Sequence, residues 1–136
     1  MKKIKQITSE ETLVIRHTAM WPDKPLEYVK LPNDDDGRHY GLFLDTTLIS
    51  VISFFKTNEE AQFRKFATLD TYQSKGYGSI LLKEIMNIAE RENLTRIWCN
   101  ARKNKSDFYA KFGMKATDNT FHKGGISYVV MERKFT

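Results

Sequence analysis

In the stretch Gln73-Ser74-Lys75-Gly76-Tyr77-Gly78-Ser79, two glycines and a lysine stand between an apolar run and a helical pattern. The apolar run is Phe63–Leu69, and the helical pattern continues to Asn93. This order predicts a strand, a turn and a helix. The first N–H groups of a helix have no intrahelical partner, and the helix dipole adds a partial positive charge at that end. The stretch therefore predicts a binding site for phosphate.

The two glycines suit such a turn, because Gly76 and Gly78 lack a Cβ and allow both positive φ and the close approach of an anion. The pattern Q-x-x-G-x-G is neither a Walker A loop nor a dinucleotide fingerprint, since Leu81 stands where the latter needs its third glycine. Taken alone, so short a match also fits an ordinary strand-to-helix connection. Lys75 supplies a mobile cation beside the two glycines.

Length and composition predict a single domain spanning residues 1–136, with one core. Hydrophobic residues make up 40% and charged residues 29%, and no apolar run approaches the roughly 20 residues of a membrane span. The basic start, Met1–Gln6, is not followed by the apolar segment of a secretory signal. The single cysteine, Cys99, excludes an intrachain disulfide. We therefore expect a cytoplasmic protein without a membrane partner.

The net charge of +5 fits either nucleic acid or a polyphosphate ligand. Because the lysines and arginines are scattered, we favour a small anion and expect no nucleic-acid partner. Cys99 lies in the apolar run Ile97-Trp98-Cys99 and is expected in the core. His17 has no second histidine or cysteine at metal-ligand spacing, so we expect no metal site.

The N-terminal half predicts one helix and an antiparallel meander. Lys3–Ile7 is a strand, and Thr8 with Glu11 forms a capping box for a helix that continues to Met20. The segment from Pro22 to Gly37 is irregular, and its run Asp34-Asp35-Asp36 is expected to be a solvated turn. The next strands, joined by short turns, are Arg38–Leu44, Leu48–Phe55 and the strand that starts at Phe63.

The C-terminal half predicts a long amphipathic helix, Gly78–Glu92, with Asn93 at its C′ position. The strand Thr95–Ala101 follows this helix, so it should run parallel to the Phe63 strand. A short helix, Ser106–Phe112, is closed by Gly113, and Lys115–His122 and Ile126–Lys134 form a last strand pair. The buried side of the long helix should comprise Leu81, Leu82, Ile85, Met86, Ile88 and Ala89.

With these elements the chain resembles the GCN5-related N-acetyltransferase (GNAT) superfamily over nearly its whole length. The resemblance rests on Q-x-x-G-x-G between strand and helix, the strand Thr95–Ala101, the meander with its closing hairpin, and Phe108-Tyr109-Ala110-Lys111-Phe112-Gly113-Met114, which is similar to the family's F-Y-x-x-x-G-F. It implies a mixed α/β fold. That fold has a mostly antiparallel sheet of about six or seven strands, one central parallel pair that splays apart, and about three or four flanking helices.

The family fold implies that acetyl-CoA binds in the opening of the splayed pair as a cosubstrate. Its pantetheine arm would pair with the backbone of Phe66, Ala67 and Thr68, and its pyrophosphate would lie on Gln73–Ser79. A backbone N–H near Ala67 would polarise the thioester carbonyl. The implied activity is direct transfer of an acetyl group to a primary amine of a small molecule or a peptide. A homodimer is compatible with this activity.

Tyr109 matches the family's general acid, which protonates the departing thiolate. The family's CoA-contacting Asn would fall at Arg102, whereas Asn104 lies closer to Tyr109. Near the end of the chain, Ser127 and Tyr128 replace the Pro-His of one bacterial subgroup, so that histidine's role does not transfer. The general base stays open among Glu59, Glu60, His39 and a water chain, with His39 expected to be structural or substrate-lining. The alternative to an enzyme is a non-catalytic CoA sensor or a basic module that binds nucleic acid.

Overall fold

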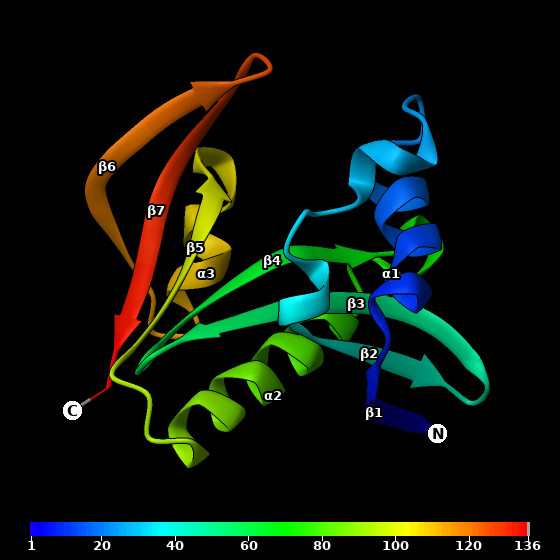
Figure 1. Ribbon diagram of the computed structural model, residues 1–136, viewed down its shortest axis with the longest axis horizontal. Coiled ribbons are helices and arrows are strands. Elements are labelled where there is room, and N and C mark those ends of the chain that lie inside the picture. Colours follow the sequence, from blue (N-terminus) through cyan, green and yellow to red (C-terminus); the bar gives the residue numbers. More distant parts are fainter. Residues whose placement is uncertain (136) are drawn as a thin grey trace. The chain divides into compact units, whose positions relative to one another are not determined.

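The computed structural model describes residues 1–135 and confirms the mixed α/β class. Seven strands form one sheet in the order β1-β2-β3-β4-β5-β7-β6 (Figure 1). The strands are β1 (Lys2–Ile7), β2 (Arg38–Leu44), β3 (Thr47–Thr57), β4 (Glu60–Thr68), β5 (Arg96–Arg102), β6 (Lys115–Lys123) and β7 (Ile126–Lys134). The α-helices are α1 (Ser9–Ile15), α2 (Tyr77–Arg91) and α3 (Ser106–Ala110), with a π-helical turn η1 (Arg16–Met20) and 3-10 turns η2 (Leu26–Val29), η3 (Asp34–Asp36), η4 (Asp70–Tyr72) and η5 (Lys103–Lys105).

The described chain divides into two compact units. The first unit consists of Met1–Phe55 and Arg64–Ile85, and the second consists of Lys56–Phe63 and the chain from Met86 onward. Three elements, β3, β4 and α2, contribute residues to both units.

In the first unit, β1, β2 and β3 form an antiparallel meander. Lys2–Ile7 pairs with His39–Leu44 of β2, and the pairing of β2 with β3 is irregular between Leu42 and Phe43. A Cβ at Gly41 would press on Leu48 Cδ1, so the end of that leucine side chain would have to shift to accommodate it. The core of this unit gathers around Ile15, Val51 and Ala67, packed by residues of β1, η1 and β3.

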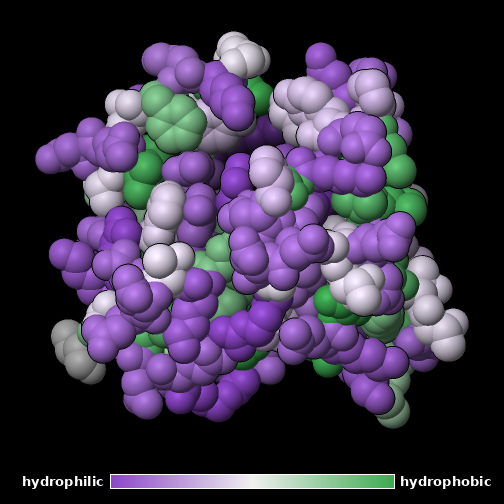
Figure 2. Space-filling view, in the orientation of Figure 1, coloured by the Kyte–Doolittle hydropathy of each residue, from purple (hydrophilic) through white to green (hydrophobic). Residues whose placement is uncertain are grey.

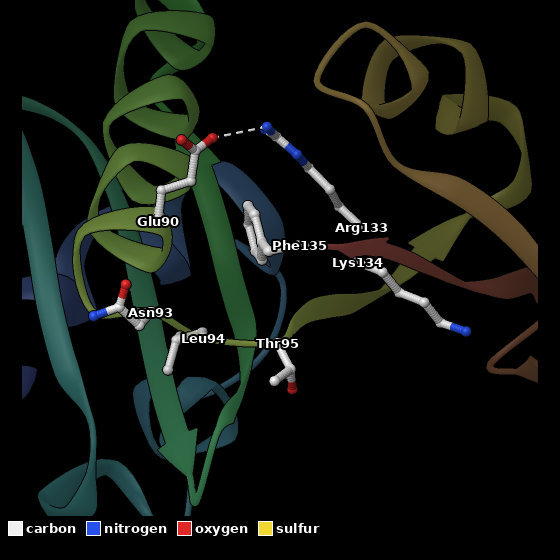
Figure 3. A pocket seen from close by; sticks show the side chains of 7 residues that line it. All are labelled: Glu90, Asn93, Leu94, Thr95, Arg133, Lys134 and Phe135. Carbon is white, nitrogen blue, oxygen red and sulfur yellow. Dashed lines mark hydrogen bonds and ion pairs between the residues drawn. The ribbon is translucent and has the colours of Figure 1, made fainter.

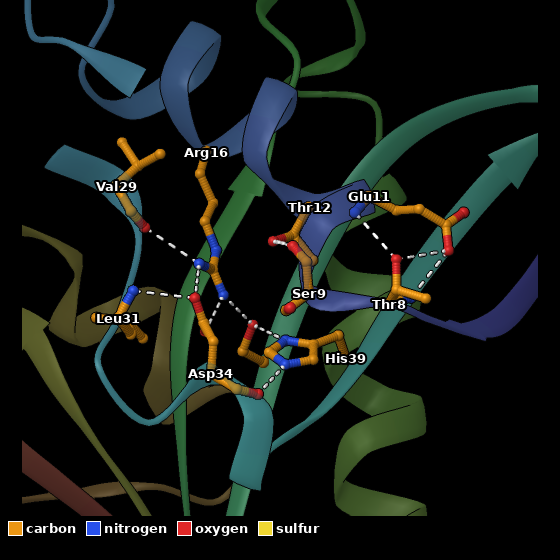
Figure 4. A network of polar contacts seen from close by, with 10 residues as sticks. Thr8, Ser9, Glu11, Thr12, Arg16, Val29, Leu31, Asp34 and His39 are labelled. Atoms are coloured by element: carbon orange, nitrogen blue, oxygen red, sulfur yellow. Dashed lines mark hydrogen bonds and ion pairs between the residues drawn. The ribbon is translucent and has the colours of Figure 1, made fainter. Parts of the chain in front are cut away.

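The predicted capping box is present at the start of α1. The backbone N–H of Glu11 donates to Thr8 Oγ1 at 3.2 Å, and the Glu11 carboxylate accepts from the Thr8 N–H at 2.9 Å (Figure 4). The helical segment ends near Met20, as expected, but its last five residues widen into η1. Arg16, the first residue of this turn, is completely buried.

The acidic run before β2 is not the solvated turn that we expected, because Asp34 is buried at 8% exposure. Its two carboxylate oxygens accept hydrogen bonds from the Arg16 guanidinium, each at 2.8 Å. A run of aspartates usually indicates an exposed turn, but here the ion pair with Arg16 keeps Asp34 buried. Asp35 and Asp36 are exposed, as predicted.

The amphipathic helix α2 has the predicted buried side. Leu81, Leu82, Ile85, Met86, Ile88 and Ala89 are at most 7% exposed. The helix ends as predicted at Asn93, whose φ of 58° lies in the left-handed region. The Asn93 N–H donates to the Glu90 carbonyl and the Leu94 N–H to the Ala89 carbonyl, which is the Schellman arrangement.

In the second unit, the first residues of β4 and β5 form the predicted parallel pair, but β4 begins at Glu60 and not at Phe63 as predicted. Glu60, Ala61 and Gln62 pair with Arg96, Ile97 and Trp98, and no later residue of β4 is in this register. Antiparallel pairing joins β5 to β7 and β7 to β6. Arg96 links three strands, because it donates to Glu60 at 3.1 Å and to Glu132 at 2.6 Å.

Hydrophilic side chains cover most of the face seen in Figure 2. The large hydrophobic side chains that are exposed within residues 1–135 are Met1, Val14, Leu26 and Tyr28. No helix in this part of the chain is long and apolar enough to span a membrane.

Candidate active site

The predicted phosphate-binding turn is anchored to the end of β4 by the Gln73 side chain. Gln73 Nε2 donates to the Thr68 carbonyl at 2.8 Å and to Asp70 Oδ1 at 3.1 Å. The Gln73 N–H donates to the Asp70 carbonyl at 3.2 Å, which closes η4. Gln73 therefore fixes the direction in which the chain leaves the sheet.

Two residues of the turn have a left-handed backbone, Ser74 with φ of 61° and Gly76 with φ of 87°. Glycine adopts this conformation without steric cost, whereas serine does so rarely. A Cβ at Gly76 would meet no atom within 4 Å, so the space on that side of the backbone is open. The sequence predicted a positive φ at Gly76 but not at Ser74, because no residue preference marks that position.

Gly78 has a different role from Gly76. A Cβ at Gly78 would lie 3.2 Å from Phe66 Cζ and 3.3 Å from Thr68 Oγ1. Gly78 thus allows the first turn of α2 to lie close against the end of β4. We had interpreted both glycines through the approach of an anion, whereas the structure gives Gly78 a packing role.

The start of α2 presents the backbone N–H groups that the sequence predicted. The Ile80 N–H donates to the Gly76 carbonyl at 3.2 Å. The N–H groups of Tyr77, Gly78 and Ser79 precede this bond and have no helical carbonyl within reach of an i−4 bond. The helix runs for 15 residues, so its dipole places a partial positive charge at this end.

The end of β4 carries Phe66, Ala67 and Thr68, and it is held against β3 by Ser50. Ser50 Oγ donates to the Ala67 carbonyl at 3.0 Å and lies 2.8 Å from Thr68 Oγ1. Just before this segment, Lys65 has φ of 53°, a left-handed conformation inside a strand. Such a residue interrupts the regular ladder, as in a β-bulge.

Tyr109 lies on α3, where aromatic rings surround it. Its ring centroid is 5.2 Å from that of Phe108 and 5.9 Å from that of Phe63. Burial raises the pKa of the Tyr109 phenol well above its usual value; the nearby Cys99 adds to the rise and Arg102 opposes it. The phenol therefore keeps its proton throughout the physiological pH range.

Cys99 behaves as the core residue that we predicted. Its side chain is 3% exposed, and burial raises the pKa of its thiol to about 12. The residue is a thiol at neutral pH and not a thiolate nucleophile.

His39 is structural. Its Nδ1 lies 2.7 Å from Ser53 Oγ, and its Nε2 lies 2.9 Å from the Asp34 carbonyl oxygen. A carbonyl only accepts, so Nε2 donates to it, and Nδ1 is hydrogen-bonded to the Ser53 hydroxyl. With both nitrogens engaged and 3% exposure, His39 has no free nitrogen for an acceptor amine.

Four other residues that the sequence singled out are either exposed or packed on a neighbouring ring. Glu59 is exposed, and the exposed Glu60 pairs with Arg96. Asn104 is exposed in η5. Tyr128 stacks on Phe121 with ring centroids 5.1 Å apart.

The first unit thus contains all ten residues predicted to bind acetyl-CoA, from Phe66–Thr68 and Gln73–Ser79, and the second unit contains Tyr109. Within the first unit, Gln73 and Gly78 bring the two groups of cofactor residues together at the end of β4. Among residues 1–135, no group of three or more His, Cys, Asp or Glu side chains is placed to hold a metal ion.

A separate pocket in the second unit lies at the C-terminal end of α2 (Figure 3). The Arg133 guanidinium and the Glu90 carboxylate form an ion pair of 2.8 Å across it. The C-terminal end of a helix carries partial negative charge, which disfavours phosphate. None of the predicted site residues lines this pocket, so we do not assign it to the cofactor. Its lining residues are Glu90, Asn93, Leu94, Thr95, Arg133, Lys134 and Phe135.

Comparisons with known proteins identify the family. A model of the acetyltransferase (GNAT) domain matches residues 5–135. An uncharacterised N-acetyltransferase of Bacillus subtilis, YitI, is 34% identical, and the match covers 96% of this chain and 95% of YitI. The chain therefore belongs to the GNAT family of acetyl-CoA-dependent N-acetyltransferases.

Solved structures share the fold at low sequence identity. A putative N-acetyltransferase from Lactobacillus plantarum has a TM-score of 0.87 at 17% identity, with 98% of this chain and 97% of that chain covered. An acetyltransferase from Bacillus subtilis, solved in complex with CoA, has a TM-score of 0.78 at 18% identity, with both chains covered completely.

Proposed function

We propose that this chain transfers the acetyl group of acetyl-CoA directly to a primary amine of a small molecule or a peptide, in a ternary complex. The observation that carries the proposal is the turn at the start of α2. There an open left-handed glycine, a run of N–H groups before the first helical bond and an exposed lysine follow one another. Because the chain belongs to the GNAT family, we take acetyl-CoA to be the anionic ligand of this turn.

In this proposal the residues at the end of β4 and in the turn hold the cosubstrate. The backbone of Phe66, Ala67 and Thr68 pairs with the pantetheine arm, and Gln73–Ser79 bind the pyrophosphate. The bound amine must be neutral, so it first gives a proton to a base or to water. Its nitrogen then attacks the thioester carbon, and a backbone N–H near Ala67 stabilises the negative oxygen. The C–S bond then breaks and the thiolate leaves, while the nitrogen gives its extra proton to the same base or to water as the amide forms.

Tyr109 protonates the leaving thiolate in this scheme. A proton donor must hold its proton until negative charge develops on the sulfur, and burial of Tyr109 ensures that it does. After the transfer, the phenolate regains a proton from solvent. We further propose that residues 1–136 act as one domain, in the cytoplasm, without a metal cofactor.

The test is Tyr109→Phe, which removes the hydroxyl and keeps the ring that packs on Phe63 and Phe108. A positioned proton donor contributes about 10²–10⁴-fold to the rate. We expect kcat to fall by about this factor, with KM for acetyl-CoA nearly unchanged, because the interaction forms chiefly in the transition state. The measurement is the single-turnover rate of CoA release with an amine that the wild-type protein acetylates.

Tyr128→Phe is the matched control, since it removes a tyrosine hydroxyl from a ring of the same unit that is stacked on Phe121. This variant should retain the wild-type rate. The raised pKa of Tyr109 also predicts that the rate does not fall through loss of its proton below about pH 10, since a group whose pKa is raised stays protonated there. An unchanged single-turnover rate in Tyr109→Phe would make Tyr109 a packing residue only.

A further inference from the structure

Arg64 is a partly buried cation that has no partner among the described residues 1–135. It belongs to β4, and its side chain is between buried and exposed. Among residues 1–135, no carboxylate or carbonyl accepts a hydrogen bond from its guanidinium, and no ion pair includes it. A guanidinium has five N–H donors, and no nitrogen of Arg64 is both buried and unpartnered, so these donors reach solvent. The Arg64 guanidinium is therefore available to a hydrogen-bond acceptor from outside the chain.

The one carboxylate in its surroundings is already occupied. Asp34 accepts from both terminal nitrogens of Arg16, each at 2.8 Å, and from the Leu31 N–H at 2.9 Å (Figure 4). Arg16 also donates to the Val29 carbonyl at 3.1 Å and to Ser53 Oγ at 2.9 Å. The Arg16–Asp34 pair is thus a fixed part of the fold and offers no acceptor to Arg64.

The charges around Arg64 do not balance. Burial lowers the pKa of Arg64, the positive charge of Arg16 lowers it further, and Asp34 opposes the change. The Nε atom of Arg16 is buried without a hydrogen-bond partner, which leaves a second unpaired donor in this cluster. Two guanidinium groups therefore feel the charge of one carboxylate, and of the two only Arg16 is hydrogen-bonded to it.

We propose that Arg64 binds an anionic group, a carboxylate or a phosphate, of the acceptor amine. The Arg16–Asp34 pair would hold the surroundings of Arg64 in place. The inference rests on the proposed function, because the amine is the second substrate of that reaction. Arg64 lies three residues before Ala67 on the same strand, where the acetyl group would be activated. A guanidinium recognises either anion by two parallel hydrogen bonds, which a neutral amine cannot offer.

The experiment uses acceptors in matched pairs, with CoA release as the readout. One arm compares the 20 common α-amino acids with their α-amides, which lack the carboxylate charge. A second arm compares O-phosphoethanolamine with ethanolamine, and a third contains polyamines without an anionic group. We expect acceptors from the first or the second arm to be used, with kcat/KM at least tenfold above that of their neutral partners. The arm that responds identifies the anion.

The variants Arg64→Gln and Arg64→Lys test the residue itself. Arg64→Gln should abolish the preference for the anionic partner, chiefly by raising KM for the acceptor, and Arg64→Lys should retain part of it. Arg91→Gln removes an equal charge from an exposed position on α2. This control should change neither the preference for the anionic partner nor KM for the acceptor. KM for acetyl-CoA should stay at the wild-type value in all three variants.

Each outcome separates this inference from the proposed function. Equal use of neutral and anionic partners, or use of polyamines alone, refutes the inference and leaves the acetyltransferase reaction intact. A raised KM for acetyl-CoA in Arg64→Gln also refutes it, since the anion would then be a phosphate of the cosubstrate. If the protein neither binds acetyl-CoA nor acetylates any amine of the three arms, the proposed function fails, and this inference fails with it.

Discussion

At the scale of single residues, the two glycines of the turn illustrate how one residue type serves two physical purposes. Gly76 has a positive φ and open space beside it, whereas Gly78 allows α2 to approach Phe66 and Thr68. Substitution at Gly78 would therefore disturb packing, and substitution at Gly76 would disturb the ligand site. Only Gly76 offers a clean test of phosphate binding.

We predict that Gly76→Glu weakens acetyl-CoA binding at least tenfold, because a carboxylate would stand where the pyrophosphate should lie. A charge-assisted hydrogen bond contributes about 1.5–3 kcal/mol, and each 1.4 kcal/mol is tenfold in Kd. Isothermal titration calorimetry measures the change, with circular dichroism to verify the fold.

The matched control is Gly125→Glu in the turn between β6 and β7. Gly125 also has a positive φ, 77°, and its Cβ would likewise meet no atom within 4 Å. The control adds the same charge with the same backbone strain, so it should leave Kd unchanged. Wild-type affinity in a folded Gly76→Glu protein would exclude this turn as the phosphate site.

At the scale of elements, the Arg16–Asp34 pair joins two segments that have little regular structure. Arg16 lies in η1 and Asp34 in η3 (Figure 4). Arg16 also donates to Ser53 Oγ on β3. Burial alone would raise the pKa of Asp34, but the hydrogen bonds from Arg16 and the Leu31 N–H, together with the charge of Arg16, lower it. The carboxylate is thus ionised in the folded protein, and its loss would leave the Arg16 charge buried without compensation.

We predict that Asp34→Asn lowers the free energy of unfolding by about 3 kcal/mol or more, the range measured when one partner of a buried pair is removed. Urea unfolding at pH 7 measures this loss. Asp35→Asn is the control, because Asp35 is the exposed neighbour in the same turn, and it should change stability little.

The Arg16–Asp34 pair also predicts how the free energy of unfolding depends on pH. Because the folded-state pKa of Asp34 is lowered, its contribution is complete above the unfolded-state pKa of about 3.9. The contribution is lost as the pH falls through the folded-state pKa. The stability difference between wild type and Asp34→Asn should therefore shrink below about pH 4. A difference that is equal at pH 7 and pH 3 would contradict this account.

At the scale of the whole molecule, the predicted roles are divided between the two compact units, with the cofactor residues in the first and Tyr109 in the second. The elements β3, β4 and α2 run through both units. Ligand binding and unfolding of the whole chain are therefore linked, and this linkage can be measured without knowledge of the amine.

We predict that acetyl-CoA at a hundredfold excess over Kd stabilises the protein by about 2.7 kcal/mol. For a chain of this size the melting temperature should then rise by several degrees, since each kcal/mol shifts a small domain by roughly 4–8 °C. The melt should show one transition, as the single-domain proposal requires. ATP and NAD should have much smaller effects, and the Gly76→Glu protein should not respond to acetyl-CoA. A larger shift with ATP or NAD would contradict the assignment of the turn.

The sequence by itself determined the local features of this protein. The capping box at Thr8, the buried side of α2 and the end of that helix at Asn93 were all correctly predicted, because each depends on residues within a few positions of one another. The order of strands and helices, together with the glycine turn, also sufficed to indicate the GNAT family.

Only the tertiary structure decided the burial and the roles of residues whose partners lie far away in the chain. Asp34 looked like part of a solvated acidic turn, but it is buried because Arg16, 18 positions away, binds it. His39 was left open as a base, and it proved structural because Ser53 and the Asp34 backbone occupy its ring. Arg64 gave no signal in the sequence, since an unpaired cation is recognised only when every nearby acceptor is known. The physical reason is the same in all three cases: the cost of burying a charged or polar group depends on long-range contacts that local patterns do not contain.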